Sequence, residues 1–231
     1  MALDLPAAGW TSRIARLLED LDFAISPAIE TAFSVYLDQV VTWNARMDLT
    51  AARTLDELVD LSFADAVVIA REERRRSGAL EARWADVGSG AGAPGIPLFL
   101  LLSEGAPSFS GTLVEPRVKR VAFLRSVLGT LGLDGIDVVR SRSDTLAAHT
   151  FSHTVARATL PPPRWLEEGA RLSTEAVWVL LARESAPSHP GWSIDHELSY
   201  CWPATRVARR ALRYVPTPRG CDEHVGGKHP R

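Results

Sequence analysis

The sequence has few of the features that place a protein in a membrane, in an oxidising compartment or around a metal ion. No apolar run approaches the roughly 20 residues of a membrane-spanning helix, and the start, MALDLPAAGW, lacks the basic and apolar segments of a signal peptide. The two cysteines, Cys201 and Cys221, show no CxxC or cysteine–histidine spacing. We therefore expect a cytoplasmic protein with plain thiols, no metal site and no contact with a membrane.

An excess of charge of one sign is also missing. The chain has 26 basic and 28 acidic residues, and a formal net charge of -2. A protein that coats nucleic acid through its overall field needs a basic face, so any contact with RNA must be local. The candidate surface is a set of basic residues: Arg117, Lys119, Arg120, Arg125, Arg140, Arg142, Arg157 and Arg164. The same residues would equally fit the solvated ends of helices and strands.

Residues 1–80 predict a helical region. The Ser26-Pro27 pair provides an N-cap followed by proline at the first helical position, and apolar residues at helical spacing follow it. Thr54 and Glu57 have the spacing of a capping box and begin a second helical stretch. This helical region should precede a domain of another kind.

Residues 81–215 change to short apolar strands that alternate with helices, which is typical of an α/β sheet. From residue 216 onward, proline, glycine and charge without periodicity predict a disordered tail. The expected strands cover residues 84–87, 111–115, 136–140, 154–157, 176–182, 200–202 and 206–214.

A glycine-rich loop follows the first of these strands. The segment DVGSGAGAPGIP, residues 86–97, joins a strand to a helix, the context in which such a loop binds a ligand. Glycines allow the ligand to approach the backbone closely. Glu115 ends the next strand, where a carboxylate can accept hydrogen bonds from both hydroxyls of a ribose. The two features together predict a nucleotide-like ligand.

Two classes of ligand remain compatible with this loop. Gly88, Gly90 and Ala93 satisfy the dinucleotide fingerprint, which tolerates alanine at its third position, so an NAD-binding oxidoreductase is one reading. The spacing DVGxGxG is also similar to the first motif of S-adenosylmethionine-dependent methyltransferases, in which Asp86 would anchor the methionine ammonium. The chain has no recognisable Tyr-x-x-x-Lys or histidine-centred group for hydride transfer, which favours the methyl donor.

A longer stretch of sequence resembles one family. The string DVGSGAGAPGIPL, with EPRVKRVAFLR from Glu115 onward, resembles the bacterial 16S ribosomal RNA guanine-N7 methyltransferases, also called ribosomal RNA small subunit methyltransferase G or glucose-inhibited division protein B. Upstream, Trp43-Asn44 with DLTA from Asp48 is similar to the family's WNxxxNLTA segment. Downstream, VARA from Val155 is similar to its SRA motif. The resemblance covers most of the chain.

The resemblance implies a Rossmann-like, seven-stranded class I methyltransferase sheet flanked by helices, with S-adenosyl-L-methionine as methyl donor. It places the donor site on these residues: Asp86, Gly88, Gly90, Gly92, Ala93, Glu115, Ser143, Asp144 and Arg157. From residue type alone, Ser143 and Asp144 would also fit a polar turn or a helix cap. The implied partner is RNA, namely 16S ribosomal RNA or the small ribosomal subunit, and the implied state is a monomer.

The implied reaction needs no general base, because N7 of guanine attacks the methyl group as an unprotonated ring nitrogen. Alignment of the two groups would supply most of the catalysis. Arg157 and Arg183 are the candidate catalytic residues, as positive groups near the guanine O6. Trp165, beside Arg164, is the candidate for stacking against a base, although tryptophan more often fills a core or covers a sheet.

Three departures from the family's pattern leave the substrate open. Ser62 stands where the family has histidine, Arg183 lies one residue from the position of a family lysine, and residues 160–164 are unusually rich in proline. The chain could therefore be a diverged member that methylates another RNA or a small molecule. It could also be a ribosome-associated protein that binds the donor without catalysing transfer.

Overall fold

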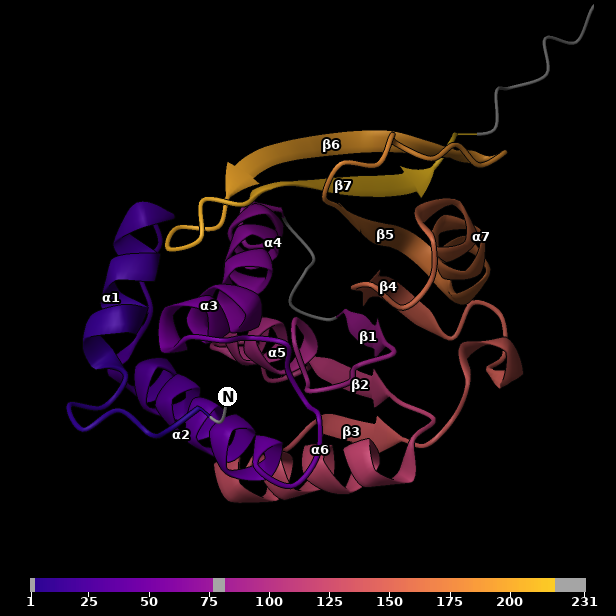
Figure 1. Cartoon of the computed structure of the whole chain (residues 1–231). Helices are drawn as coiled ribbons and strands as arrows, with labels where there is room; N and C mark the ends of the chain where they lie inside the picture. Colours follow the sequence, from indigo (N-terminus) through magenta and orange to yellow (C-terminus); the bar gives the residue numbers. More distant parts are fainter. Residues whose placement is uncertain (1–2, 77–81, 219–231) are drawn as a thin grey trace, which may run out of the picture.

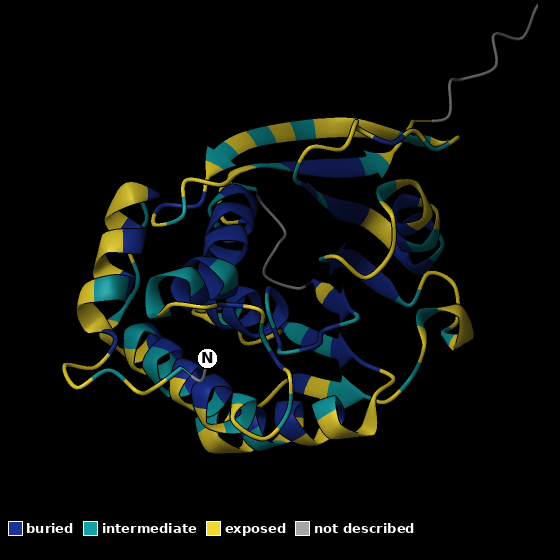
Figure 2. Cartoon of the chain, viewed as in Figure 1, coloured by how far each residue is buried: buried dark blue, intermediate teal, exposed yellow. Residues whose placement is uncertain are grey.

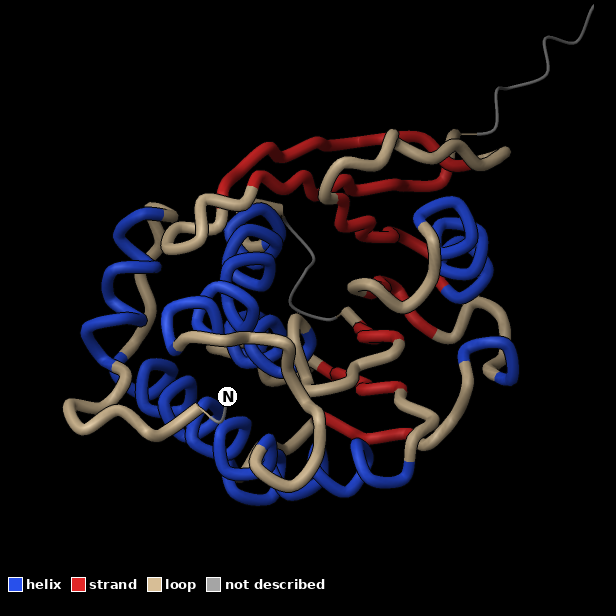
Figure 3. Tube along the Cα trace, in the orientation of Figure 1, coloured by secondary structure: helices blue, strands red, loops and turns tan. Residues whose placement is uncertain are grey.

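The computed structural model describes residues 3–76 and 82–218, and within them the chain forms a seven-stranded sheet in the order β3-β2-β1-β4-β5-β7-β6. The first five strands pair in parallel, and β7 is antiparallel to both of its neighbours. Figure 3 shows the strands as one continuous ladder. The strands are β1 (Arg83–Val87), β2 (Ser110–Val114), β3 (Ile136–Val139), β4 (Phe151–Ala156), β5 (Ser173–Leu181), β6 (Trp192–Cys201) and β7 (Ala208–Pro216). The predicted α/β fold is confirmed.

Two of the helices, α2 and α3, begin at the caps that the sequence predicts. The Ser26 hydroxyl accepts a hydrogen bond from the Ile29 amide at 3.3 Å, and Thr54 accepts one from the Glu57 amide at 3.1 Å. The helices are α1 (Thr11–Asp20), α2 (Pro27–Asn44), α3 (Leu55–Val59), α4 (Asp65–Glu73), α5 (Gly95–Ser103), α6 (Val118–Leu131) and α7 (Pro162–Leu172). A π-helical turn, η1 (Asp60–Ala64), joins α3 to α4, and a 3-10 turn, η3 (Ser143–Thr145), follows β3.

The two faces of the sheet are covered unequally. One large apolar cluster joins the N-terminal helices α1 to α4 with α5, α6 and one face of the sheet. A smaller cluster lies between the other face and α7, and includes Trp165, Val177 and Tyr214. Figures 1 and 2 show the result: the N-terminal helices pack against the helix layer beside the sheet, and their inward sides are buried.

A buried polar network ties α4 to the sheet. The Glu73 carboxylate, 1% exposed, accepts hydrogen bonds of 2.8 Å from Trp178 Nε1 and from Arg213 Nε. His153 lies 3.8 Å from the same carboxylate and stacks on Trp84, and burial lowers the pKa of His153. Because removal of one partner would leave a buried charge unpaired, the network fixes the helical region against β4, β5 and β7.

The last strands differ most from expectation. β6 covers ten residues, Trp192–Cys201, instead of the three predicted at 200–202, because its sequence alternates only weakly and nearly all of it is half-buried or exposed at the sheet edge. β7 continues to Pro216. Residues 77–81, at the predicted boundary between the helical region and the sheet, and residues 219–231 of the predicted tail lie outside the described residues. Within the described part of the chain, no helix is long and apolar enough to cross a membrane.

Candidate functional site

The glycine-rich loop lies between β1 and α5, at the carboxyl ends of the parallel strands. Gly88, Gly90 and Gly92 all have positive φ, of 77°, 56° and 89°, a conformation that residues with a side chain rarely adopt. The Gly88 and Ser89 amides both donate to the carbonyl oxygen of Val114 on β2, at 2.8 and 3.1 Å. The loop is thus fixed to the neighbouring strand. The space beside Gly90 is open to a ligand, since a Cβ there would meet nothing closer than Arg120 Nη1 at 3.4 Å, whereas Thr159 and Ile96 fill the space beside Gly88 and Gly92.

Asp86 lies beneath this loop and is 1% exposed. Its Oδ2 accepts a hydrogen bond from the Gly95 amide at 3.2 Å, at the start of α5. Burial raises the pKa of Asp86 to about 7, although the positive charge of Arg157 opposes the shift. Its carboxyl group therefore changes charge close to neutral pH.

Glu115 connects the glycine loop to the end of β2. Its two carboxylate oxygens accept hydrogen bonds from the Gly90 amide at 3.0 Å and from the Arg117 amide at 2.9 Å. The side chain is 2% exposed and lines the same cavity as Gly90. Each oxygen keeps a further lone pair, so the carboxylate can still accept hydrogen bonds from a ligand.

These residues surround a cavity of about 420 Å³, which we call the glycine-loop cavity. Of the residues predicted to bind a donor, Gly88, Gly90, Ala93, Glu115 and Arg157 line it together. Leu49 also lines it, from the segment that resembles WNxxxNLTA. The sequence thus brings five of the nine predicted donor residues to one cavity.

Arg157 stands at the end of β4 and is held from the N-terminal helices. Its Nη1 donates to the Leu61 carbonyl oxygen in the π-helical turn, and to Asp65 Oδ2 at 3.2 Å. Within residues 3–76 and 82–218, no hydrogen-bond acceptor contacts its Nε or Nη2. The guanidinium is therefore fixed through one nitrogen and keeps other donors for a ligand.

Asp65 in turn is held by the hairpin of β6 and β7. Its Oδ1 accepts hydrogen bonds from the Tyr200 hydroxyl at 2.7 Å and from Trp202 Nε1 at 2.9 Å. Burial and the Asp65 carboxylate raise the pKa of Tyr200 well above its usual range, so the hydroxyl stays a donor. The sequence does not indicate that Tyr200 and Trp202 contact Asp65, since they lie more than 130 residues away from it.

A second cavity, of about 230 Å³, shares Arg157 and Ala158 with the first. We call it the hairpin cavity, because Trp202 and Arg209 of the β6–β7 hairpin form part of its wall. The Arg209 guanidinium lies over the Trp202 ring, 4.1 Å from its centroid. The remaining lining residues are Leu61, Asp65, Leu160, Pro162, Leu180, Leu181, Ala182 and Glu184.

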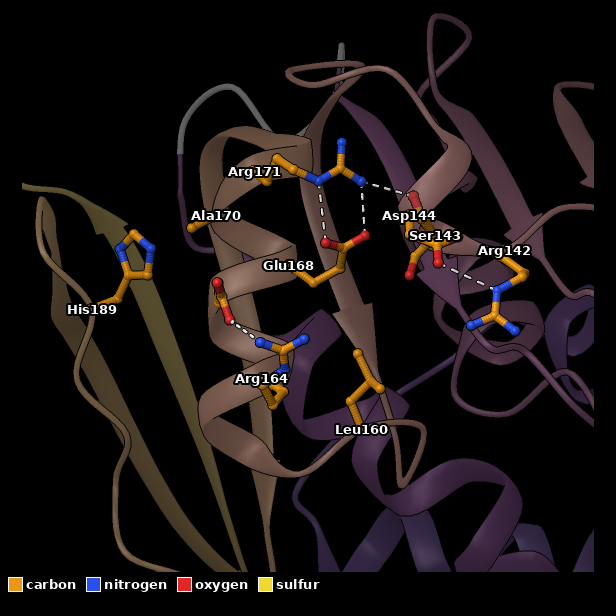
Figure 4. Close-up of a pocket in the computed structure, with 10 residues that line it drawn as sticks. Arg142, Ser143, Asp144, Leu160, Arg164, Glu168, Ala170, Arg171 and His189 are labelled. Carbon is orange, nitrogen blue, oxygen red and sulfur yellow. Dashed lines mark hydrogen bonds and ion pairs between the residues drawn. The ribbon is translucent and has the colours of Figure 1, made fainter.

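Ser143 and Asp144 lie apart from the glycine-loop cavity. Both line the larger hollow between η3 and α7 that Figure 4 shows, of about 470 Å³. In this hollow Arg171 donates to the Ser143 carbonyl oxygen at 2.8 Å and pairs with Glu168, which ties α7 to η3. Ser143 also lines a hollow of about 200 Å³ beside Gly88, with Val114, Pro116 and Leu160. Of these two residues, Ser143 alone lines a hollow that also contains a residue of the glycine loop.

Three other predicted residues, Arg183, Gly92 and Trp165, line neither the glycine-loop cavity nor the hairpin cavity. Arg183 is exposed, and its neighbours Ala182 and Glu184 line the hairpin cavity while Arg183 itself does not. Gly92 lies in the loop but outside the lining of the glycine-loop cavity. The proposal that Trp165 stacks on a base is wrong, because this side chain is 2% exposed and donates to the Trp178 carbonyl oxygen within the core.

The WNxxxNLTA-like segment has a clear structural role. Asn44, at the end of α2, accepts hydrogen bonds through Oδ1 from the Leu49 and Thr50 amides, at 2.9 and 3.1 Å. This closes the turn after α2 and presents Leu49 to the glycine-loop cavity. From the same helix, the Tyr36 hydroxyl donates to the Ala91 carbonyl oxygen at 2.8 Å, so a hydrogen bond joins α2 to the glycine loop.

Comparison with known proteins identifies relatives. The model of the family described as rRNA small subunit methyltransferase G matches residues 29–182. The chain is 37% identical to the ribosomal RNA small subunit methyltransferase G of Halorhodospira halophila over 145 residues, which are 62% of this chain and 64% of that protein. It is 32% identical to the protein of the same name from Oleidesulfovibrio alaskensis over 181 residues, 77% of each chain. The chain thus spans less than two thirds of the Halorhodospira relative and somewhat more of the other.

Solved structures agree on the fold. A candidate O-methyltransferase of Klebsiella pneumoniae superposes with a TM-score of 0.56 at 13% identity, over 90% of this chain and 98% of that one. A candidate RNA methyltransferase of Pyrococcus horikoshii gives a TM-score of 0.51 at 15% identity, over 66% and 84%. At such identities the likeness concerns the class I methyltransferase fold. The family model covers two thirds of the sequence, and the chain therefore belongs to the rRNA small subunit methyltransferase G family.

Proposed function

We propose that this protein transfers a methyl group from S-adenosyl-L-methionine to N7 of a guanine in the RNA of the small ribosomal subunit. The observation that carries the proposal is the position of Arg157, at the wall shared by the glycine-loop cavity and the hairpin cavity. A donor in the first cavity and an acceptor base in the second would meet at this residue. The family to which the chain belongs supports the same assignment.

The residues of the glycine-loop cavity fit the donor. Gly88 and Gly90 present backbone without a side chain, and Glu115 lies where its carboxylate can accept hydrogen bonds from ribose hydroxyls. The mainly apolar hollow beside Gly88, lined by Val114, Pro116 and Leu160, suits the flat face of an adenine. When bound, the donor supplies a methyl group activated by a sulfonium. Asp86, which is buried next to the loop, would add negative charge near the methionine ammonium of the donor once its carboxyl group is ionised.

At the acceptor, the N7 lone pair forms a bond to the methyl carbon as the carbon–sulfur bond breaks, and the sulfur leaves with that electron pair. No proton moves, so no general base is required. The work of the protein is alignment of the two groups, which can be worth about 7–11 kcal/mol. The unpaired donors of Arg157 can hydrogen-bond to the guanine O6, next to N7, and thereby orient the base.

The remaining predicted residues fit the proposal in different ways. Ser143 would contact the adenine end of the donor, while Asp144, which lines the hollow of Figure 4 instead, would stabilise η3. Exposed basic residues at the start of α6, Arg117 and Lys119, would contact RNA phosphates next to the glycine-loop cavity. Arg183, predicted as a second positive group near the guanine O6, is exposed and does not line the hairpin cavity, so we assign it a contact with RNA phosphate at the rim. We place this reaction in the cytoplasm and assign it to a monomer.

The test is transfer of labelled methyl from S-adenosyl-L-methionine to purified small ribosomal subunits, and separately to their naked RNA. We expect label in one guanine, located by borohydride reduction and aniline cleavage, which break the chain at N7-methylguanine. Label in another base or at another atom would contradict the guanine N7 assignment. Donor binding without label in either RNA would favour a different substrate or a protein that binds the donor without transfer.

A further inference from the structure

The hairpin cavity contains a carboxylate to which neither the sequence resemblance nor the reaction gives a role. Glu184 follows β5 and lines this cavity together with Arg157. Its Oε2 accepts hydrogen bonds from the Ala182 amide at 2.7 Å and from the Arg183 amide at 2.9 Å. Backbone hydrogen bonds lower the pKa of Glu184, so the group is ionised at neutral pH.

The other oxygen of this carboxylate is available. Within the described part of the chain, no donor contacts Glu184 Oε1, whereas Oε2 is occupied twice. The side chain is exposed, and its Oε2 is held by two backbone amides, which leaves Oε1 as an acceptor. An acceptor fixed in this way is suited to reading an N–H group of a ligand, because little side-chain entropy remains to be lost when the ligand binds.

The wall beside this acceptor is suited to a planar ring. The Arg209 guanidinium lies over the Trp202 indole, 4.1 Å from its centroid, and this indole is 5% exposed, so a buried ring supports Arg209 from one side. Arginine planes of this kind stack on unpaired bases of RNA. Leu180 and Pro162 supply apolar surface, and the cavity is of the size of a single base rather than of a nucleotide chain.

We propose that Glu184 is a specificity-determining residue of the acceptor site, which reads the N1–H and N2 amino edge of guanine. This inference rests on the proposed function. A base stacked on Arg209, with O6 and N7 toward Arg157, directs its Watson–Crick edge elsewhere in the same cavity, where Glu184 supplies the acceptor. Guanine presents N–H donors on that edge, whereas adenine presents an unprotonated N1 and would face the carboxylate with a lone pair.

The first experiment compares E184Q with wild type in methyl transfer to small ribosomal subunits. Glutamine has the same shape and can keep the backbone hydrogen bonds through its carbonyl oxygen, but it then places an NH2 donor against the N–H groups of guanine. We expect kcat/KM to fall about 10- to 100-fold. The matched control is E167Q, since Glu167 is an exposed carboxylate on α7 that lines the hollow of Figure 4 and not the hairpin cavity. Its kcat/KM should stay within twofold of wild type.

The second experiment reads selectivity directly. Guanosine and inosine monophosphates, which differ only in the N2 amino group, are titrated in the presence of S-adenosylhomocysteine, and the indole N–H resonance of Trp202 is followed by NMR. We expect wild type to prefer the guanosine nucleotide and E184Q to bind the two nucleotides equally. A merely structural role of Glu184 would change both affinities alike.

The outcomes separate the two proposals. Methyl transfer by wild type together with an unchanged kcat/KM in E184Q, an unchanged nucleotide preference, or no response of wild-type Trp202 to either nucleotide would overturn the role of Glu184 alone. Failure of wild type to methylate guanine in either subunits or RNA would overturn the proposed function, and this inference with it.

Discussion

The two cavities that share Arg157 are built in different ways. The glycine-loop cavity is formed mainly by three short segments after β1, β2 and β4, with Leu49 from the turn after α2, and seven of its thirteen lining residues are glycine, alanine, serine or threonine. The hairpin cavity is formed by side chains from η1, α4, β5 and the β6–β7 hairpin, over 140 residues apart in the sequence at its extremes. The first kind of site can be recognised from small residues that lie close together in the sequence. The second kind depends on how the fold brings distant side chains together.

The largest expected effect is at the residue that both cavities share. Replacement R157A removes the only charged side chain common to their walls and should lower kcat for methyl transfer by about 100- to 1,000-fold, as for loss of one preorganised donor. Because the variant also leaves the buried Asp65 without its cation, its free energy of unfolding is measured alongside. The control is R16A, whose exposed arginine pairs with Asp56 at the surface of α1 and is not among the candidate RNA contacts. Full activity in R157A would remove the basis for treating the two cavities as one site.

The second prediction concerns the pH dependence of the donor side. The pKa of Asp86 is raised to about 7 by burial, so the folded protein binds a proton that the unfolded chain has lost above about pH 4. The Asp86 contribution to stability is therefore present at low pH and is lost as the pH rises toward 7. D86N, which stays uncharged, should lose less free energy of unfolding than wild type between pH 5 and pH 8, by a few kcal/mol at most, as measured by urea unfolding. Parallel pH profiles of the two proteins would show that Asp86 is ionised throughout.

A pair of glycine substitutions tests whether the conformation of the glycine loop makes the donor site. In G88A the new Cβ would overlap the side chain of Thr159 at a positive φ, so donor affinity should fall about tenfold, by titration calorimetry. Gly129 lies within α6, where an added Cβ meets no atom within 4 Å. G129A should keep donor affinity and gain about 0.5–1 kcal/mol in stability. Equal donor affinity in the two variants would show that the glycine-loop cavity does not hold the donor.

The smallest expected effect concerns the hairpin side. Y200F removes one of two hydrogen bonds to Asp65 Oδ1 and leaves the bond from Trp202, so Arg157 should be less well fixed and kcat should fall a few-fold at nearly unchanged donor affinity. Y214F is the control, because the Tyr214 hydroxyl donates to the Pro187 carbonyl oxygen, away from Arg157. Both variants should lose about 1 kcal/mol of stability. A loss of kcat in Y214F equal to that in Y200F would assign the effect to stability rather than to the orientation of Arg157.

The same contrast explains how much could be predicted from the sequence. The helix caps at Ser26 and Thr54, the parallel strands and the glycine loop depend on local spacing, and the structure agrees with each. Glu115 could be placed at the glycine loop because the carboxyl ends of neighbouring parallel strands meet at one edge.

The residues of the hairpin cavity could not be predicted in this way. Tyr200 and Trp202 reach Asp65 only because the antiparallel β6–β7 hairpin extends the sheet over α4, and no local pattern indicates that pairing. The length of β6 was underestimated because an edge strand exposed to solvent needs no apolar alternation. Glu184 had no signal beyond its position after β5, since its role depends on what shares its cavity.

The most direct test is calorimetric titration of the purified wild-type protein with S-adenosyl-L-methionine and, separately, with NAD. We expect the methyl donor to bind with a stoichiometry of one per chain and NAD to produce no saturable heat. Binding of NAD, or the absence of donor binding at pH values on both sides of the Asp86 pKa, would contradict the assignment of the glycine-loop cavity to a methyl donor.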